Sequence, residues 1–276
     1  MNTKLAIILG PYRNLSTLTA AVLALHPQVQ VLNHAGEVLW SDEQLDIFKT
    51  RDQPTYERFM HAAWELSGAG QRGLRGGSIL HSHAFDAEEI KALYHARYGD
   101  VTRKQEAEWL VWKESMRIQN RLMTTPDLLD QLCEQFPDIR FIMPLRDPLD
   151  CAISNARTWH VQMLNLVRGA PIDSVLDAVL DAFAWTLARH AERPDRISVF
   201  TEHDAKADVL SRLASHLGIQ AKSTWLADGE AAFTVRKREQ PPELVAHARA
   251  RILEKLAPWP EIAESLISRK PTRGTA

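Results

Sequence analysis

Cysteine is scarce in this chain, with only two residues among 276. Two cysteines cannot staple a fold of this length, so a disulfide scaffold is excluded. Cys133 and Cys151 both fall in helical patterns and lack the neighbour spacing of metal ligands. We therefore expect two reduced cysteines that serve only in packing, as is usual in a cytoplasmic protein.

Long hydrophobic runs are also missing. No stretch approaches the roughly 18 apolar residues of a membrane-spanning helix, and the apolar run at residues 5–9 is too short for the core of a signal peptide. From this we expect a cytoplasmic protein without stable membrane insertion.

Neither sign of charge dominates, because 33 Lys and Arg residues face 35 Asp and Glu residues. A broadly basic nucleic-acid-binding surface is therefore excluded. The stretch LSRLASHLGI at residues 210–219 superficially resembles the start of a helix-turn-helix, but no basic recognition helix follows it. We expect no nucleic-acid partner.

Short apolar runs alternate with segments of helical spacing along the chain. The runs predict buried strands at residues 4–9, 29–32, 109–113, 140–145 and 197–201. The helical spacing predicts helices at residues 15–25, 42–66, 86–98, 127–135, 147–160, 172–190 and 207–217, and one last helix from residue 241 onward. This alternation predicts an α/β fold with three α/β/α layers and a central, mainly parallel sheet. We expect a single domain over residues 1–276, with a helical insertion at about 38–105 that contains a glycine-rich loop at 67–78.

The loop after the first strand reads LGPYRNLSTLT and is a candidate phosphate site. In open α/β folds, ligands bind beyond the carboxyl ends of the strands. A helix N-terminus there offers backbone N–H groups, to which Arg13, Ser16 and Thr17 add donors. The alternative is that Asn14 and Ser16 merely cap the helix. The ATPase pattern GxxxxGK[ST] is absent, which disfavours an ordinary ATP- or GTP-cleaving site.

A second informative segment reads RFIMPLRDPLDCAISNARTWH, at residues 140–160. Arg146 stands at a strand exit, and Pro148 suits the first turn of the helix that follows. Ser154 lies eight residues after Arg146, two helical turns on, so the pair can hold a second phosphate. The alternative is a surface Arg146 paired with Asp147 or Asp150, a contact of little value.

Together these segments resemble the sulfotransferase family that uses 3′-phosphoadenosine 5′-phosphosulfate (PAPS). The family's first loop commonly reads PRSGTT or PKSGTT, and its second motif is R-D-P-x-D with a Ser eight positions after the Arg. GPYRNLSTL followed by AAVLALHPQV matches the first motif imperfectly, with Asn14 for the usual Ser and Leu15 for Gly. Residues 146–154 match the second motif well, and ISVFTEHD with LSRLASHLGI resembles a further segment, with Thr201 where Tyr is frequent. The resemblance spans residues 4–219 and implies a P-loop-like fold similar to that of nucleotide kinases.

The resemblance also implies residue roles. Arg146 and Ser154 would bind the 3′-phosphate of PAPS, and the first loop would hold the 5′-phosphosulfate. The loop residues implied are Arg13, Asn14, Leu15, Ser16, Thr17 and Leu18. Adenosine 3′,5′-bisphosphate (PAP) would be the product, and no metal is implied.

For the transfer step, Glu37 in NHAGEVL resembles the family's glutamate and is the expected general base, with His34 as its rival. Lys113 in LVWKES resembles the family's lysine near the donor, and with Arg13 it would stabilise charge on the bridging oxygen and the sulfonate. For the family's basic C-terminal loop, the nearest candidate is Arg236-Lys237-Arg238, with a solvated basic surface as the alternative.

Several readings stay open at this point. A small-molecule kinase of related fold and a non-catalytic nucleotide-binding module are the alternatives to sulfuryl transfer. The acceptor, whether a small molecule, a glycan or a lipid, is not specified by any motif, and neither is the oligomeric state. His81-Ser82-His83 is a weak metal signal, and a role in the acceptor site or at the surface is the preferred interpretation.

Overall fold

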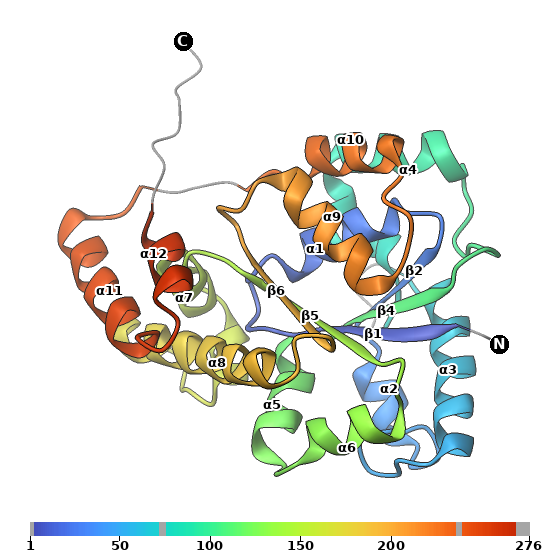
Figure 1. Ribbon diagram of the computed structural model, residues 1–276, viewed down its shortest axis with the longest axis horizontal. Coiled ribbons are helices and arrows are strands. Elements are labelled where there is room, and N and C mark those ends of the chain that lie inside the picture. Colours follow the sequence, from blue (N-terminus) through green and yellow to red (C-terminus); the bar gives the residue numbers. More distant parts are fainter. Residues whose placement is uncertain (1–2, 72–75, 236–238, 269–276) are drawn as a thin grey trace.

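A central sheet of six strands organises the computed structural model, which describes residues 3–71, 76–235 and 239–268 (Figure 1). Its strands are β1 (Lys4–Ile8), β2 (Val29–Asn33), β3 (Gly77–Ser78), β4 (Trp109–Lys113), β5 (Arg140–Leu145) and β6 (Ile197–Thr201). They lie in the order β3-β2-β4-β1-β5-β6, and every described neighbour pair is parallel except β2 with β3. The predicted α/β fold with a mainly parallel sheet is confirmed.

The strands are apolar throughout because helices cover both faces of the sheet. In and just after β1, Leu5, Ile7 and Leu9 pack into one core cluster. Ala6 and Ile8 point the other way, into a second cluster. All five residues are completely buried, so this strand lies between two hydrophobic layers.

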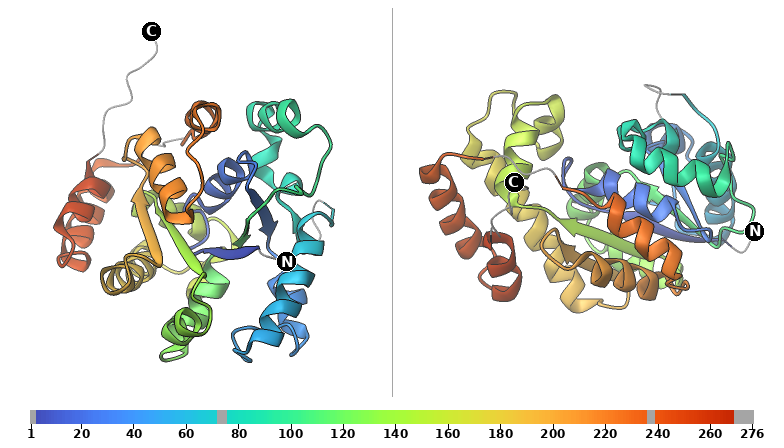
Figure 2. Two further views of the ribbon diagram at one scale, coloured as in Figure 1. Left: turned by 45° about the vertical axis from the view of Figure 1, so that its right-hand side comes forward. Right: turned by 90° about the horizontal axis from the view of Figure 1, so that it is seen from above.

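The helices form the outer layers (Figures 1 and 2). One face carries α1 (Ser16–Ala24), α4 (Glu88–Tyr98), α9 (Lys206–Leu217) and α10 (Ser223–Ala232). The other carries α2 (Gly36–Ser41), α3 (Gln53–Ser67), α5 (Met116–Thr124), α6 (Leu128–Gln135), α7 (Pro148–Ala156) and α8 (Ile172–Glu192). The last helices, α11 (Pro242–Lys255) and α12 (Pro260–Ile267), pack beside α7, α8 and β6 at one edge of the sheet.

The predicted helix at residues 42–66 is wrong in its first half. The chain forms α2 earlier, passes through turns, and starts α3 only at Gln53. Asp52 caps α3 by accepting the Thr55 N–H at 2.8 Å, and Pro54 occupies its first turn, so these two residues set the true start.

Other boundaries also differ from the prediction. The helix expected at 147–160 ends at Ala156 and is followed by a 3₁₀ segment, Trp159–Leu164. The tail forms two helices rather than one, because Pro260 begins a new helix after α11. The helices α5 and α10 were not predicted, and the glycine-rich loop ends in the short β3.

The carboxyl ends of β2, β4, β1 and β5, four neighbouring strands, meet at one edge of the sheet. This edge brings together the loops that carry the predicted site residues. Cys133 and Cys151 are free and buried, away from any disulfide. Among the described helices, none is both long and apolar enough to cross a membrane.

Candidate functional site

A cavity of about 510 Å³ opens at these carboxyl ends, within the range of roughly 300–1,000 Å³ that is usual for small-molecule sites. Its lining consists of Tyr12, Arg13, Leu15, Ser16, Thr17, Leu18, His34, Ala35, Gly36, Glu37, His83, Lys113, Arg117, Arg146 and His160. The structure therefore brings most of the predicted site residues to one place. Asn14 and Ser154 are not in this lining, but each contacts a residue that is.

The loop after β1 turns sharply into α1. Arg13 and Leu15 both have a positive φ, of 66° and 61°. No side chain caps α1, so the alternative that Asn14 or Ser16 serves only as its cap is wrong. The first helical hydrogen bond runs from Thr19 N–H to Leu15 O at 2.9 Å. The amides of residues 16–18 precede that bond and are available to an anion in the cavity.

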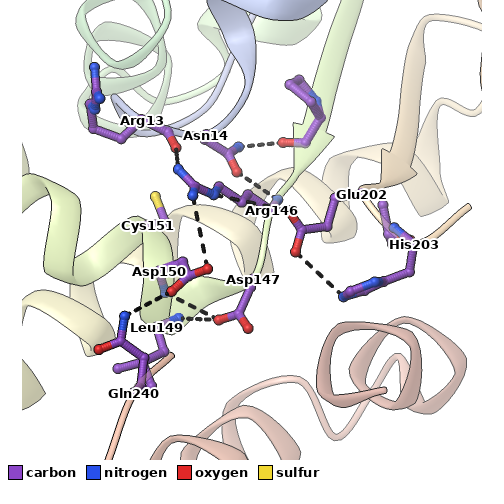
Figure 3. Close-up of polar contacts among 12 residues, drawn as sticks. Arg13, Asn14, Arg146, Asp147, Leu149, Asp150, Cys151, Glu202, His203 and Gln240 are labelled. Atoms are coloured by element: carbon purple, nitrogen blue, oxygen red, sulfur yellow. Dashed lines mark hydrogen bonds and ion pairs between the residues drawn. The ribbon is translucent and has the colours of Figure 1, made fainter. Parts of the chain in front are cut away.

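Asn14 is completely buried and holds the loop against β5 (Figure 3). Its Nδ2 donates to the Pro144 carbonyl, and its Oδ1 accepts the Arg146 N–H at 2.8 Å. A Cβ at Gly10 would lie 2.7 Å from Asn14 Nδ2, so this approach requires glycine. Asn14 thus joins the first loop to the segment that begins the RDP motif.

Arg146 is mostly buried rather than a surface arginine, since its side chain is 16% exposed. Its Nη1 donates to the Arg13 carbonyl at 3.2 Å, and its guanidinium lies 3.9 Å from Asp150 and 4.0 Å from Glu202. Arg13 in turn donates from Nε to Ser154 Oγ at 2.9 Å. The first loop and the RDP segment are therefore in direct contact.

Asp147 has a local role in that segment. Its Oδ1 accepts the N–H groups of Leu149 at 2.9 Å and Asp150 at 3.2 Å, which caps the start of α7. Pro148 occupies the first turn, as the sequence predicts. The cap fixes the helix that presents Ser154.

Lys113 and His34 lie together because β2 and β4 are paired with Asn33 opposite Lys113. Lys113 Nζ is 3.0 Å from His34 Nε2. Burial lowers the pKa of Lys113 to about 8, with Glu114 opposing the shift and Arg13 adding to it. Burial also lowers the pKa of His34. At neutral pH, the lysine is the charged member of this pair.

Glu37 projects into the cavity from the first turn of α2. Its Oε1 lies 2.8 Å from Arg117 Nη1, and the same guanidinium nitrogen is 3.6 Å from Glu114 Oε1. Arg117 and Glu114 were not predicted. The only sequence signal for them is that they follow Lys113 at the end of a strand. That strand is apolar on both faces, so its pattern does not predict which way the side chains after it point.

Tyr12 and His160 form another part of the wall that the sequence did not reveal. Their rings stack at 4.7 Å with 29° between the planes. Burial raises the pKa of Tyr12 to about 12, and burial with nearby Arg13 and Lys113 lowers the pKa of His160 to about 4. Both side chains are neutral at pH 7.

The paired histidines His81 and His83 and the basic cluster Arg236-Lys237-Arg238 were also candidate site residues. His83 lines the cavity, whereas His81 does not. Within the described ranges, no group of three or more His, Cys, Asp or Glu residues is arranged to hold a metal ion. Arg236-Lys237-Arg238 lies outside the described residues.

Comparison with known proteins gives the chain its relatives. Residues 6–201 match the profile of the Sulfotransferase family, and no curated protein matches. Among solved structures, the chain is similar to mouse sulfotransferase SULT7A1 complexed with PAP (10% identity, TM-score 0.49, 98% of this chain and 90% of that one). It is also similar to a sulfotransferase from Alicyclobacillus acidocaldarius (15% identity, TM-score 0.45, 96% of each chain) and to the sulfotransferase domain from the curacin biosynthetic pathway (15% identity, TM-score 0.45, 91% of this chain and 98% of that one). The family match covers well over half of the sequence, and the chain belongs to the sulfotransferase family.

Proposed function

We propose that the chain transfers a sulfuryl group from PAPS to a hydroxyl or amine acceptor in this cavity. The observation that carries the proposal is the contact between the two nucleotide segments, in which Arg13 reaches Ser154 and Arg146 holds the Arg13 carbonyl. Two segments whose contacting residues are 133 and 141 positions apart thereby form one cationic surface beside the N-terminus of α1.

PAPS, the sulfuryl donor, is an anionic nucleotide, and the hydrogen-bond donors and cations of this cavity suit it. The 5′-phosphosulfate would take the amides of residues 16–18 and the hydroxyls of Ser16 and Thr17. The 3′-phosphate would take Arg146 and Ser154. Asp150 and Glu202 hold the Arg146 guanidinium from the protein side, and the cavity exposes the rest of it.

Transfer forms a bond between the acceptor oxygen or nitrogen and sulfur while the bridging S–O bond breaks. The bonding electron pair leaves on the phosphate oxygen of PAP, and the acceptor proton passes to a base. Arg13 and Lys113 would stabilise the leaving oxygen and the sulfonate. With a pKa of about 8, Lys113 carries its proton at pH 7 and can donate it.

We assign the base to Glu37, with His34 as the alternative. A lysine ammonium has only donors, so Lys113 Nζ donates to His34 Nε2 at 3.0 Å, and this nitrogen is already occupied as a hydrogen-bond acceptor. His34 Nδ1 faces Glu114, at 3.8 Å from its carboxylate. The Glu37 carboxylate faces the cavity and contacts Arg117.

Donor binding is tested by calorimetry with PAP. The wild type should bind, and Arg146→Ala should bind about 10- to 100-fold more weakly, since a hydrogen bond to a charged group contributes roughly 1.5–3 kcal/mol. Arg189→Ala is the matched control, because Arg189 pairs with Glu192 on α8 away from the cavity. Absence of PAP binding by the wild type would sink the proposal, and metal-dependent ATP turnover would favour a kinase instead.

The base is tested in an acceptor screen with labelled PAPS. Glu37→Gln should keep its affinity for PAP but lose about 10²- to 10⁴-fold in turnover, as expected for loss of a general base. Glu57→Gln, an exposed change on α3, is the control. Wild-type-like turnover by Glu37→Gln would rule out Glu37 and leave His34 as the base. Tight PAP binding without transfer to any acceptor would indicate a non-catalytic module.

A further inference from the structure

Glu114 is a completely buried carboxylate directly behind the proposed transfer centre. Glutamate is rarely buried unless it is paired. Its Oε2 accepts the Gly36 N–H at 2.9 Å, and its Oε1 lies 3.8 Å from His34 Nδ1 and 3.6 Å from Arg117 Nη1. Its partners therefore come from two different loops and helices around the cavity.

Each of these partners leads to a side chain that the proposed reaction uses. Gly36 directly precedes Glu37, His34 contacts Lys113, and Arg117 pairs with Glu37. One buried carboxylate is thus connected, through a single intermediate, to both the expected base and the expected acid.

The backbone is shaped to make these contacts. His34 and Ala35 both have a positive φ, of 62° and 80°, and this turn aims the Gly36 N–H at Glu114. A Cβ at Gly36 would lie 2.9 Å from Glu114 Cδ, so only glycine permits the approach. Two consecutive left-handed non-glycine residues are costly, and such conformations concentrate at functional sites.

We propose that Glu114 is a positioning residue for sulfuryl transfer, whose buried carboxylate fixes the turn that bears Glu37, the Arg117 partner of Glu37, and the His34–Lys113 pair. This inference rests on the proposed function, because it assigns Glu37 and Lys113 to the transfer step. Glu114 itself touches neither donor nor acceptor, since it does not line the cavity.

The charge of Glu114 also supports Lys113 electrostatically. It acts against burial and raises the pKa values of both Lys113 and His34. The charged and titratable groups facing it are Tyr12, His34, Lys113 and Arg117. Removing the negative charge should therefore lower the pKa values of Lys113 and His34, and less of Lys113 would be protonated at neutral pH.

The test compares Glu114→Gln with Asp46→Asn. Asp46 is also a buried carboxylate and accepts the Phe48 N–H at 3.1 Å. It pairs at 2.8 Å with Arg121, which lies on α5 like Arg117. It is not among the lining residues of the cavity. The two variants therefore remove the same kind of buried charge, one behind the cavity and one away from it.

Three measurements separate positioning from mere stability. NMR titration of labelled histidine and lysine side chains should show lower pKa values for His34 and Lys113 in Glu114→Gln and unchanged values in Asp46→Asn. Turnover at saturating PAPS should fall about tenfold or more in Glu114→Gln, because a small misplacement of a reacting group can cost up to about 10²-fold, with a smaller change in the KM for PAPS. Unchanged titrations together with wild-type turnover would overturn the inference.

Arg117→Gln keeps the inference testable if Glu114→Gln fails to fold. This change breaks the link to Glu37 and leaves the hydrogen bond between Glu114 and Gly36 in place. Turnover should again fall, but the pKa of His34 should rise, because the Arg117 charge lowers it. An unchanged His34 titration with full turnover would contradict the proposed network.

Failure of the proposed function has a different signature. If wild-type protein does not bind PAP, PAPS-dependent transfer is overturned whatever the titrations show. If PAP binds and Glu114→Gln leaves both the titrations and the turnover unchanged, the role of Glu114 is overturned and PAPS-dependent transfer stands.

Discussion

Left-handed backbone conformations mark the site at the scale of single residues. Seven non-glycine residues among those described have a positive φ, and five of them follow the strands β1, β2 and β4 at the cavity edge. These five are Arg13, Leu15, His34, Ala35 and Ser115. Strain of this kind persists where the surroundings enforce it, and here it turns each loop sharply enough to present side chains and amides to one cavity.

Leu15 is the informative case, because it stands where the resemblance expects glycine. Leucine pays a left-handed cost of roughly 1–2 kcal/mol there, yet the loop keeps the conformation that glycine would favour. We expect Leu15→Gly to retain or improve PAP affinity, measured by calorimetry. In denaturant unfolding, Leu15→Val should be no more stable than Leu15→Gly, because a β-branched residue fits a positive φ poorly. Loss of PAP binding in Leu15→Gly would mean that the leucine side chain itself contributes to the site.

At the scale of elements, Lys104 fastens the segment between β2 and β4 to the core. Its ammonium has three donors, and three carbonyls meet it, those of Ala24, His26 and Val29. These carbonyls lie at the C-terminal end of α1 and the start of β2, where orphan carbonyls and the helix dipole favour a cation. The ring of Tyr98 in α4 also lies 4.5 Å from the ammonium. One end of α1 therefore holds the segment between β2 and β4, and the other borders the cavity.

Lys104→Met should lower the free energy of unfolding by about 3 kcal/mol, because it leaves buried carbonyls without a donor. Lys91→Met, an exposed change on α4, should alter it by less than about 0.5 kcal/mol. Urea denaturation measures both. PAP affinity should be retained in Lys104→Met, since the cavity lies at the opposite end of α1, and a large loss of affinity would contradict this separation.

At the scale of the whole molecule, the sequence predicts the strands of the sheet better than the helices that cover it. The five strands that were predicted are short, mostly apolar segments, whereas β3 has only two residues and depends on pairing with β2. The nine residues of α5 are amphipathic and bury Ile118 and Leu122, so their pattern was sufficient to predict a helix, whereas Gly229 within α10 weakens its helical signal. Boundaries failed where caps and prolines, such as Asp52 and Pro54, decide them.

The candidate site likewise contains residues that the sequence predicted and residues that it did not. Arg13 and Arg146 were predictable because they follow strands, and parallel strands bring their carboxyl ends together. Lys113 was identified only through the family resemblance. His160 and Arg117 reach the cavity only through the packing of α7, its 3₁₀ extension and α5. No local pattern encodes such long-range placement. The near-neutral net charge of -2 likewise hides a cavity in which several cations face one carboxylate at its surface.

The hydrogen bonds of Asn14 have a consequence for protein engineering. One amide side chain joins the first loop to the backbone of residues 144 and 146, so the first loop and the RDP segment are directly linked. A loop transplanted from another sulfotransferase would need its own matching strand end, or an asparagine retained at this position. Libraries that diversify residues 13–18 should therefore hold position 14 constant or vary it together with the exit of β5.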